Sequence, residues 1–233
     1  MIEARPVDCG AIYEEERRAF VKFLRSCDAP ELATSVPATP EWSVRDVLAH
    51  VVGVTADLNA ENFGDSSDPD AWTAAQVRAR RDRTVDELAA EWDGEAPRFE
   101  DGLRLFGYEI GSHYIGDLLQ HVADVKHALG RPRPSDNLTL AVALDFYLIS
   151  FEQSLDEQQC GAVQLGAGEE SWTLGSGAAI ASVTAERFEL FRSLGGRRSE
   201  AQVRALSWRG DMDAVVPIFS RYPLPEADII DHT

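Results

Sequence analysis

The first two thirds of the chain alternate long segments of helical hydrophobic periodicity with short polar joints. Apolar side chains recur at the spacing of an amphipathic helix, which predicts that each segment buries one face. The long segments are 11–27, 44–62, 85–92 and a last one that begins near 103 or 107 and ends at 129, and a shorter one is 71–81. Capping-box patterns begin at Ser43 and Thr84, and Gly130 with prolines behind it ends the last segment. Four long helices with short joints, one of them at 93–97, predict an antiparallel four-helix bundle.

The pattern changes after Asn137. One more helical segment, 138–156, is followed by short apolar runs that glycines separate, which is typical of strands and turns. The runs 162–166 and 171–174 predict a β-hairpin, 179–183 a further strand, and 185–194 a helix. We therefore predict an α+β protein, with a helical bundle at 1–134 and a smaller α/β domain at 135–233.

Charge and composition narrow the classes of partner. The formal net charge is −18, whereas binding to nucleic acid or to an anionic membrane relies on clustered Lys and Arg. Neither partner is expected, and a small molecule is the better candidate. No run of about 20 apolar residues indicates a membrane span, and the charged N-terminus lacks the apolar run of a signal peptide. We expect a cytoplasmic monomer or weak homodimer.

The cysteines do not indicate a disulfide framework or a zinc knuckle. Cys9, Cys27 and Cys160 are far apart and odd in number, without paired spacing. Cys160 lies near a predicted helix end and could be a nucleophile, but no basic group adjoins it in the sequence, so a buried or idle thiol is the competing interpretation.

Three residues form a candidate metal site. Asp117 and His121 are four positions apart, so they share one face of the last bundle helix, and His50 lies on the apolar face of the second bundle helix. Imidazole and carboxylate are the usual ligands of a catalytic zinc or similar divalent ion, and three protein ligands leave a position open for water or substrate. Facing helices of a bundle are a common place for such a site.

A simpler interpretation competes with the metal site. His50 and His121 could be core histidines that hydrogen-bond to Asp117, Asp124 or a backbone carbonyl, because the D-x-x-x-H spacing often arises by chance. Asp124 could instead accept a hydrogen bond from a ligand histidine and fix its tautomer. His113, on the same stripe, could be a fourth ligand or contact a substrate.

Two segments resemble a known family. Residues 39–51 read TPEWSVRDVLAHV and residues 117–130 read DLLQHVADVKHALG. Both resemble signatures of the mycothiol-dependent maleylpyruvate isomerase family, part of the DinB-like superfamily of metal-binding four-helix bundles. The resemblance covers about residues 8–130, and the remainder is similar, more loosely, to that family's smaller α/β domain.

The resemblance implies a site and a chemistry. His50, Asp117 and His121 would hold a divalent ion, with zinc as the first candidate. Mycothiol would be the thiol cofactor. The activity would be isomerisation of a small electrophile such as maleylpyruvate, or S-transfer to it. Arg197, in a Gly-Arg pair similar to one in the family, would contact the thiol or a substrate carboxylate. Asp124, which lies in the second matching segment, is our other candidate catalytic residue. Asp117 departs from the family pattern, which commonly has the longer Glu there.

Two other classes of function stay open. The short carboxylate of Asp117 favours a noncatalytic ligand-binding or regulatory bundle. A thiol-independent metallohydrolase would use the open metal position to activate water, with Asp124 or His113 as base. The sequence does not identify the substrate.

Overall fold

The chain forms two compact units in the computed structural model, which describes residues 2–64 and 68–233. One unit comprises Val7–Gly111, His121–Arg133 and Asp231–Thr233, and the other comprises residues 2–6, Ser112–Gln120 and Pro134–Ile230. Helix α6 (Tyr108–Ala128) is continuous and contributes residues to both units. The predicted bounds 1–134 and 135–233 therefore stay a prediction.

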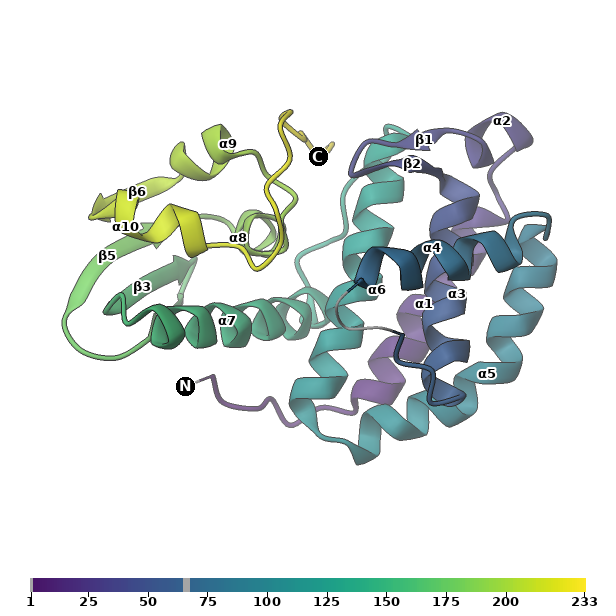
Figure 1. Cartoon of the computed structure of the whole chain (residues 1–233), viewed down its shortest axis with the longest axis horizontal. Coiled ribbons are helices and arrows are strands. Elements are labelled where there is room, and N and C mark those ends of the chain that lie inside the picture. Colours follow the sequence, from purple (N-terminus) through teal and green to yellow (C-terminus); the bar gives the residue numbers. More distant parts are fainter. Residues whose placement is uncertain (1, 65–67) are drawn as a thin grey trace. The chain divides into compact units, whose positions relative to one another are not determined.

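The first unit is built from long helices (Figure 1). They are α1 (Cys9–Leu24), α3 (Val44–Asn59), α4 (Pro69–Arg80), α5 (Val85–Leu105) and the end of α6. Ser43 and Thr84 cap α3 and α5 through complete capping boxes, as the sequence predicts. Buried Thr55 joins three of these helices, because its hydroxyl accepts from Trp92 Nε1 at 3.0 Å and lies 3.2 Å from the Tyr13 hydroxyl.

The predicted joint at 93–97 is wrong. Helix α5 runs through Pro97 without a break, although a proline inside a helix removes a hydrogen bond and costs about 3 kcal/mol. Trp92, Ala96, Phe99 and Leu103 lie on the buried face of α5, before and after the proline. Burying such side chains contributes about 1.5–3 kcal/mol for each large one, which outweighs the cost of Pro97.

A short helix and a hairpin connect α1 to α3. Helix α2 (Ala29–Leu32) follows the Asp28 capping box, and strands β1 (Ser35–Val36) and β2 (Thr39–Ser43) pair antiparallel. The sequence analysis did not predict these elements. Strand β2 ends at the cap of α3, so the hairpin fixes Trp42 directly beside the start of that helix.

The second unit packs helices with a four-stranded sheet, in the order β4-β3-β5-β6. Its strands are β3 (Ala162–Ala167), β4 (Glu170–Leu174), β5 (Ala179–Thr184) and β6 (Ser207–Gly210). Its helices are α7 (Leu138–Gln158), α8 (Arg187–Leu194), α9 (Glu200–Arg204), α10 (Met212–Val215) and a 3-10 turn (Val216–Ile218). The predicted β3–β4 hairpin and the α+β class are confirmed.

Helix α7 is the core helix of this unit. By length and mean hydropathy (1.3) it could span a membrane, contrary to the sequence-based expectation, but 67% of its apolar window is buried inside the protein. Its Asp145 is also buried and accepts a hydrogen bond of 2.7 Å from Arg5 in the N-terminal segment. The same arginine reaches Glu170 on β4, so the N-terminal segment belongs with the sheet.

Candidate metal centre

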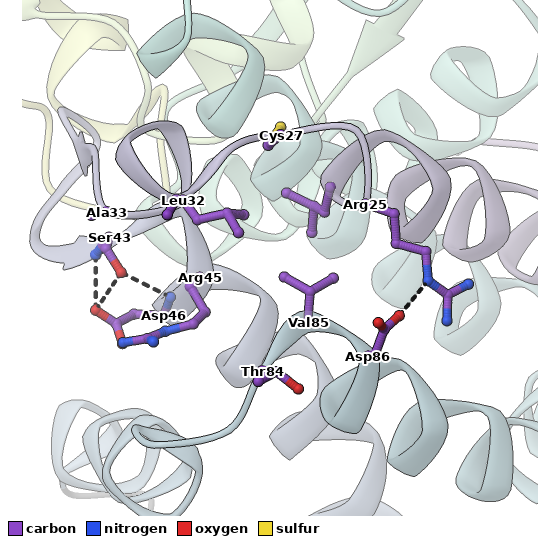
Figure 2. Close-up of a pocket in the computed structure, with 12 residues that line it drawn as sticks. Arg25, Cys27, Leu32, Ala33, Ser43, Arg45, Asp46, Thr84, Val85 and Asp86 are labelled. Carbon is purple, nitrogen blue, oxygen red and sulfur yellow. Dashed lines mark hydrogen bonds and ion pairs between the residues drawn. The ribbon is translucent and has the colours of Figure 1, made fainter.

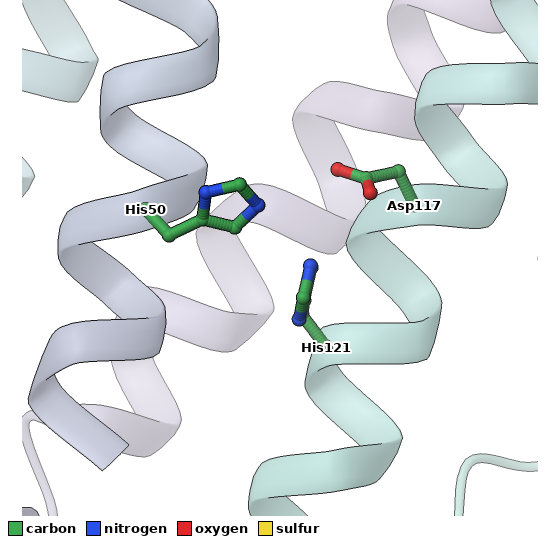
Figure 3. A group of neighbouring side chains, drawn as sticks. All are labelled: His50, Asp117 and His121. Carbon is green, nitrogen blue, oxygen red and sulfur yellow. The ribbon is translucent and has the colours of Figure 1, made fainter. Parts of the chain in front are cut away.

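The three residues predicted as metal ligands lie together. His50 projects from α3, and Asp117 and His121 project from successive turns of α6 (Figure 3). One potential ligand atom from each residue lies within 4.8 Å of those of the other two. The imidazole rings of His50 and His121 are 4.9 Å apart, nearly perpendicular, and each histidine is only 5% exposed. Asp117 is half-buried.

The donor set fits a divalent cation. If no pair of ligand atoms is more than 4.8 Å apart, some point lies within about 2.8 Å of all three, against about 2.0–2.2 Å for zinc bonds to nitrogen and oxygen. Side-chain adjustments of less than about 1 Å would close the difference. Two imidazoles and one carboxylate leave a fourth, open position, as in catalytic zinc sites.

Polar side chains from α3 and α4 support His50. Its Nδ1 lies 2.9 Å from Oε1 of Gln76, and Nε2 of Gln76 donates to Asp57 Oδ2 at 2.9 Å. Gln76 is 2% exposed, so this contact is shielded from water. Neither Gln76 nor Asp57 was predicted from the sequence as part of the site. The helical periodicity of α4 could have placed Gln76 on a buried face, but no local signal pairs it with His50.

Trp42 covers both histidines. Its ring lies 4.8 Å from that of His50 and 6.4 Å from that of His121, tilted by 40° and 36°. In the structure its indole lies beside both imidazoles.

Asp124 faces His121 without a direct hydrogen bond between them. It is fully buried, and its Oδ2 lies 3.9 Å from His121 Nδ1, beyond hydrogen-bonding distance. The predicted catalytic role of Asp124 stays a prediction. The geometry suits an electrostatic effect on the imidazole better than a proton relay.

Arg197 and Asp117 both affect the pKa values of two nearby tyrosines. It follows α8, and its Nη1 donates to the carbonyl of Gly195 at 3.2 Å. Burial raises the pKa of Tyr147, and Asp117 raises it further, whereas Arg197 lowers it. The pKa of Tyr222 is raised by burial and then by Asp117, and lowered by nearby arginines that include Arg197. Arg197 and Asp117 therefore act on the same two phenols.

Neighbouring Arg198 is engaged elsewhere. Arg198 is 2% exposed, and its guanidinium binds both carboxylate oxygens of Glu189 at 2.8 Å. Buried Arg192 donates to Gln120 Oε1 at 2.7 Å, on the turn of α6 between Asp117 and His121. The sequence analysis missed this contact, because it joins residues 72 positions apart.

His113 and Cys160 lie outside the cluster. The His113 ring stacks on Phe146 at 4.2 Å and 9°, and burial lowers its pKa to about 4, with a smaller effect from Arg221. It is therefore neutral near pH 7 and does not join the three clustered ligands. Cys160 follows α7, and its Sγ makes a weak contact with the Gln158 carbonyl at 3.9 Å.

A cavity of about 740 Å³ lies at the start of α3 and α5, and the three clustered residues do not line it (Figure 2). Its walls include Arg25, which is bound to Asp86 at 2.8 Å, and Asp46, which is occupied by the cap of α3. Burial and nearby Glu31 raise the pKa of Cys27 in this cavity. That thiol is therefore protonated near neutral pH and is a poor nucleophile.

Comparisons with known proteins agree with the resemblance found in the sequence. Residues 13–109 match the family model described as Mycothiol maleylpyruvate isomerase N-terminal domain. The match includes His50 and ends before Asp117. A search of curated proteins gave no match.

Two solved structures are similar to the chain, both of a mycothiol-dependent maleylpyruvate isomerase and one of them a point mutant. Sequence identity is 15% and, for the mutant, 13%, with TM-scores of 0.47 and 0.46, and each alignment covers 81% of this chain and 88% of the other. The family model matches less than half of this chain, and the matched segment contains residues 39–51, one of the two segments that carry the resemblance found in the sequence.

Proposed function

We propose that this protein is a metal-dependent enzyme that uses mycothiol to isomerise, or to form a thioether with, a small electrophile similar to maleylpyruvate. The His50, Asp117 and His121 cluster on α3 and α6 is the observation that carries the proposal. It supplies two imidazoles and a carboxylate, and His50 lies within the segment that the family model matches.

The three residues would hold the ion, zinc by the chemistry of the donors. When bound, such an ion lowers the pKa of a thiol or polarises a substrate carbonyl. The indole of Trp42 lies beside both histidines and would limit water on that side, which would strengthen electrostatic interactions there. Arg197 would bind a substrate carboxylate, a task that suits its planar guanidinium.

In the isomerase reaction, the thiolate sulfur forms a bond to one alkene carbon, and the electron pair of the double bond moves onto the conjugated carbonyl. The remaining single bond rotates. The pair then returns, the carbon–sulfur bond breaks, and the trans double bond and thiolate are regenerated without a net proton. In the transferase reaction, the adjacent carbon is protonated instead and the thioether is retained.

The test measures metal content and turnover together. Protein purified without chelators or nickel resin is expected to contain about one equivalent of metal and to convert an electrophile only when mycothiol is present. His50→Ala and His121→Ala should lose both properties. His127→Ala is a matched control, because His127 lies on the same helix but stacks on His232, outside the cluster. If both cluster variants keep full metal and thiol-dependent turnover, the proposal is wrong.

The short carboxylate of Asp117 favours one rival, a noncatalytic binding module. Asp117→Asn and Asp117→Glu address it directly, since the first removes the charge and the second restores the family's usual length. The enzyme proposal expects loss of turnover with Asn and retention with Glu. Tight binding of thiol or electrophile without conversion, in the wild type and the Glu variant alike, would identify the module. The cytoplasmic location and the monomeric or weakly dimeric state stay predictions.

A further inference from the structure

A row of polar side chains runs along α3 beneath α4. His50 and Asp57 are seven residues apart, so they lie on one face of α3, about 10.5 Å apart along its axis. The amide of Gln76 bridges this separation, with Oε1 at 2.9 Å from His50 Nδ1 and Nε2 at 2.9 Å from Asp57 Oδ2.

The donors and acceptors in this row fit together in one direction of hydrogen bonding. A carboxylate accepts but does not donate, so Asp57 must receive an N–H from Gln76. The carbonyl end of Gln76 then faces His50 and can only accept, which requires a proton on His50 Nδ1. In a neutral imidazole the other nitrogen, Nε2, then carries the lone pair. Figure 3 shows Nε2 of His50 on the side of Asp117 and His121.

The packing of α4 on α3 holds Gln76 in this position. Gly53 lies one turn beyond His50, and a Cβ there would come within 2.5 Å of Gln76 Cβ and 2.8 Å of its Cγ. The glycine therefore provides the room in which Gln76 lies. Arg80, one turn after Gln76, binds Glu91 of α5 at 2.6 Å and anchors the end of α4.

Asp57 is itself fixed. Its Oδ1 accepts a hydrogen bond of 3.0 Å from Asn62 Nδ2, beyond the end of α3, so the carboxylate receives one amide donor at each oxygen. A reversed Gln76 would place its carbonyl against this carboxylate. The orientation of Gln76 is thus set from the side away from His50.

We propose that Gln76, oriented by Asp57, is a positioning residue that holds His50 as the Nδ1–H tautomer with Nε2 ready to bind a metal ion. The metal part of this inference rests on the proposed function, whereas the tautomer is a property of the metal-free protein. Removing such an outer hydrogen bond typically weakens metal binding by 10–100-fold.

Two measurements test it. Long-range ¹⁵N–¹H NMR of histidine-labelled, metal-free protein at about pH 8, where imidazole is neutral, distinguishes the two tautomers, with His50 assigned by His50→Ala. Competition with a chromophoric chelator gives the Kd for Zn²⁺. Gln76→Met keeps the side chain's bulk but neither polar group, and we expect it to give a mixture of His50 tautomers and a 10–100-fold weaker Kd.

The control is Val77→Ala. Val77 is buried beside Gln76 on α4, so its truncation loosens the packing of that helix without touching the polar row. It should lower Tm while leaving the His50 tautomer and the Zn²⁺ affinity unchanged. A rescue variant is Asp57→Glu, which keeps an acceptor and should hold the tautomer better than Asp57→Leu.

The outcomes are distinguishable. If wild-type protein binds no Zn²⁺ through His50 and His121, the proposed function fails, and the NMR spectra of the metal-free protein still decide the role of Gln76. If Gln76→Met leaves His50 entirely as the Nδ1–H tautomer, or if Val77→Ala changes the tautomer equally, the inference is overturned.

Discussion

Thr55→Val tests how the bundle that carries His50 is stabilised. Thr55 is fully buried on α3; its hydroxyl donates to the Val51 carbonyl at 3.1 Å and accepts from Trp92 Nε1 at 3.0 Å. The Tyr13 hydroxyl lies 3.2 Å away. Valine has nearly the same shape, so the substitution removes an acceptor without opening a cavity.

The expected cost follows from the groups left behind. Trp92 is fully buried, so its indole N–H would lose its acceptor where water cannot replace it, which costs about 1–3 kcal/mol. Loss of the contact with Tyr13 adds about 1 kcal/mol. We expect Thr55→Val to lower the free energy of unfolding by about 2–4 kcal/mol in urea denaturation.

A matched variant and a double-mutant cycle isolate the hydrogen bond. Thr55→Ser keeps the hydroxyl and loses one methyl group, so it should cost about 1 kcal/mol. In a Trp92→Phe background the indole donor is absent, and Thr55→Val should cost about 1–2 kcal/mol less than in the wild type. A Thr55→Val protein within about 0.5 kcal/mol of wild type, or an equal cost in both backgrounds, would refute the reasoning.

Two further predictions concern the second unit. The pKa of His113 is about 4 in the folded chain and about 6.5 when unfolded, so the unfolded state binds more protons between these values and stability should fall as the pH falls through this window. We expect the free energy of unfolding to fall by about 2 kcal/mol from pH 7 to 5. His113→Phe, whose ring can still stack on Phe146, should largely remove this loss. If the urea midpoints of the wild type and His113→Phe depend equally on pH, the prediction is wrong. Gly210 has φ +85°, and a Cβ there would lie 2.3 Å from the Ile180 carbonyl oxygen. Gly210→Ala should therefore cost at least about 2 kcal/mol and reduce amide protection in β6, and an unchanged Tm would show that the β5–β6 pair relaxes freely.

Much of the fold could be predicted from local patterns in the sequence. Helix α3 begins at the predicted cap, Ser43, and α6 ends where Gly130 predicts. The break predicted at Pro97 is wrong because the effect of a proline on the backbone is local, whereas the packing that keeps α5 helical involves residues distant in the sequence. Strand β6 is only four residues long and exists through pairing with β5, so no periodicity marks it.

The candidate site also has a part that local spacing predicts and a part that depends on the tertiary fold. Asp117 and His121 were predictable as neighbours because a helix places residues four apart on one face. That His50 meets them depends on the packing of α3 against α6, and it was expected only because ligand sites are common between bundle helices. Arg197 illustrates the limit, since its place near Tyr147 depends on the fold of the second unit, which the sequence predicts only in outline.

Gly53 is the one sign in the sequence that another side chain, here Gln76, packs closely against α3 near His50. A glycine in a helix interior costs roughly 0.5–1 kcal/mol relative to alanine, so its presence in the middle of α3 needs a packing reason. The reason is the close approach of Gln76, whose Cβ would lie 2.5 Å from an alanine methyl at position 53. Gly53→Ala should therefore raise the helix propensity of α3 and yet displace Gln76 from His50. Its effect on the His50 tautomer should resemble that of Gln76→Met, although the substituted residue is not itself a candidate ligand. Such a result would separate the position of the Gln76 amide from its chemical identity, because Gly53→Ala leaves both polar groups of Gln76 intact.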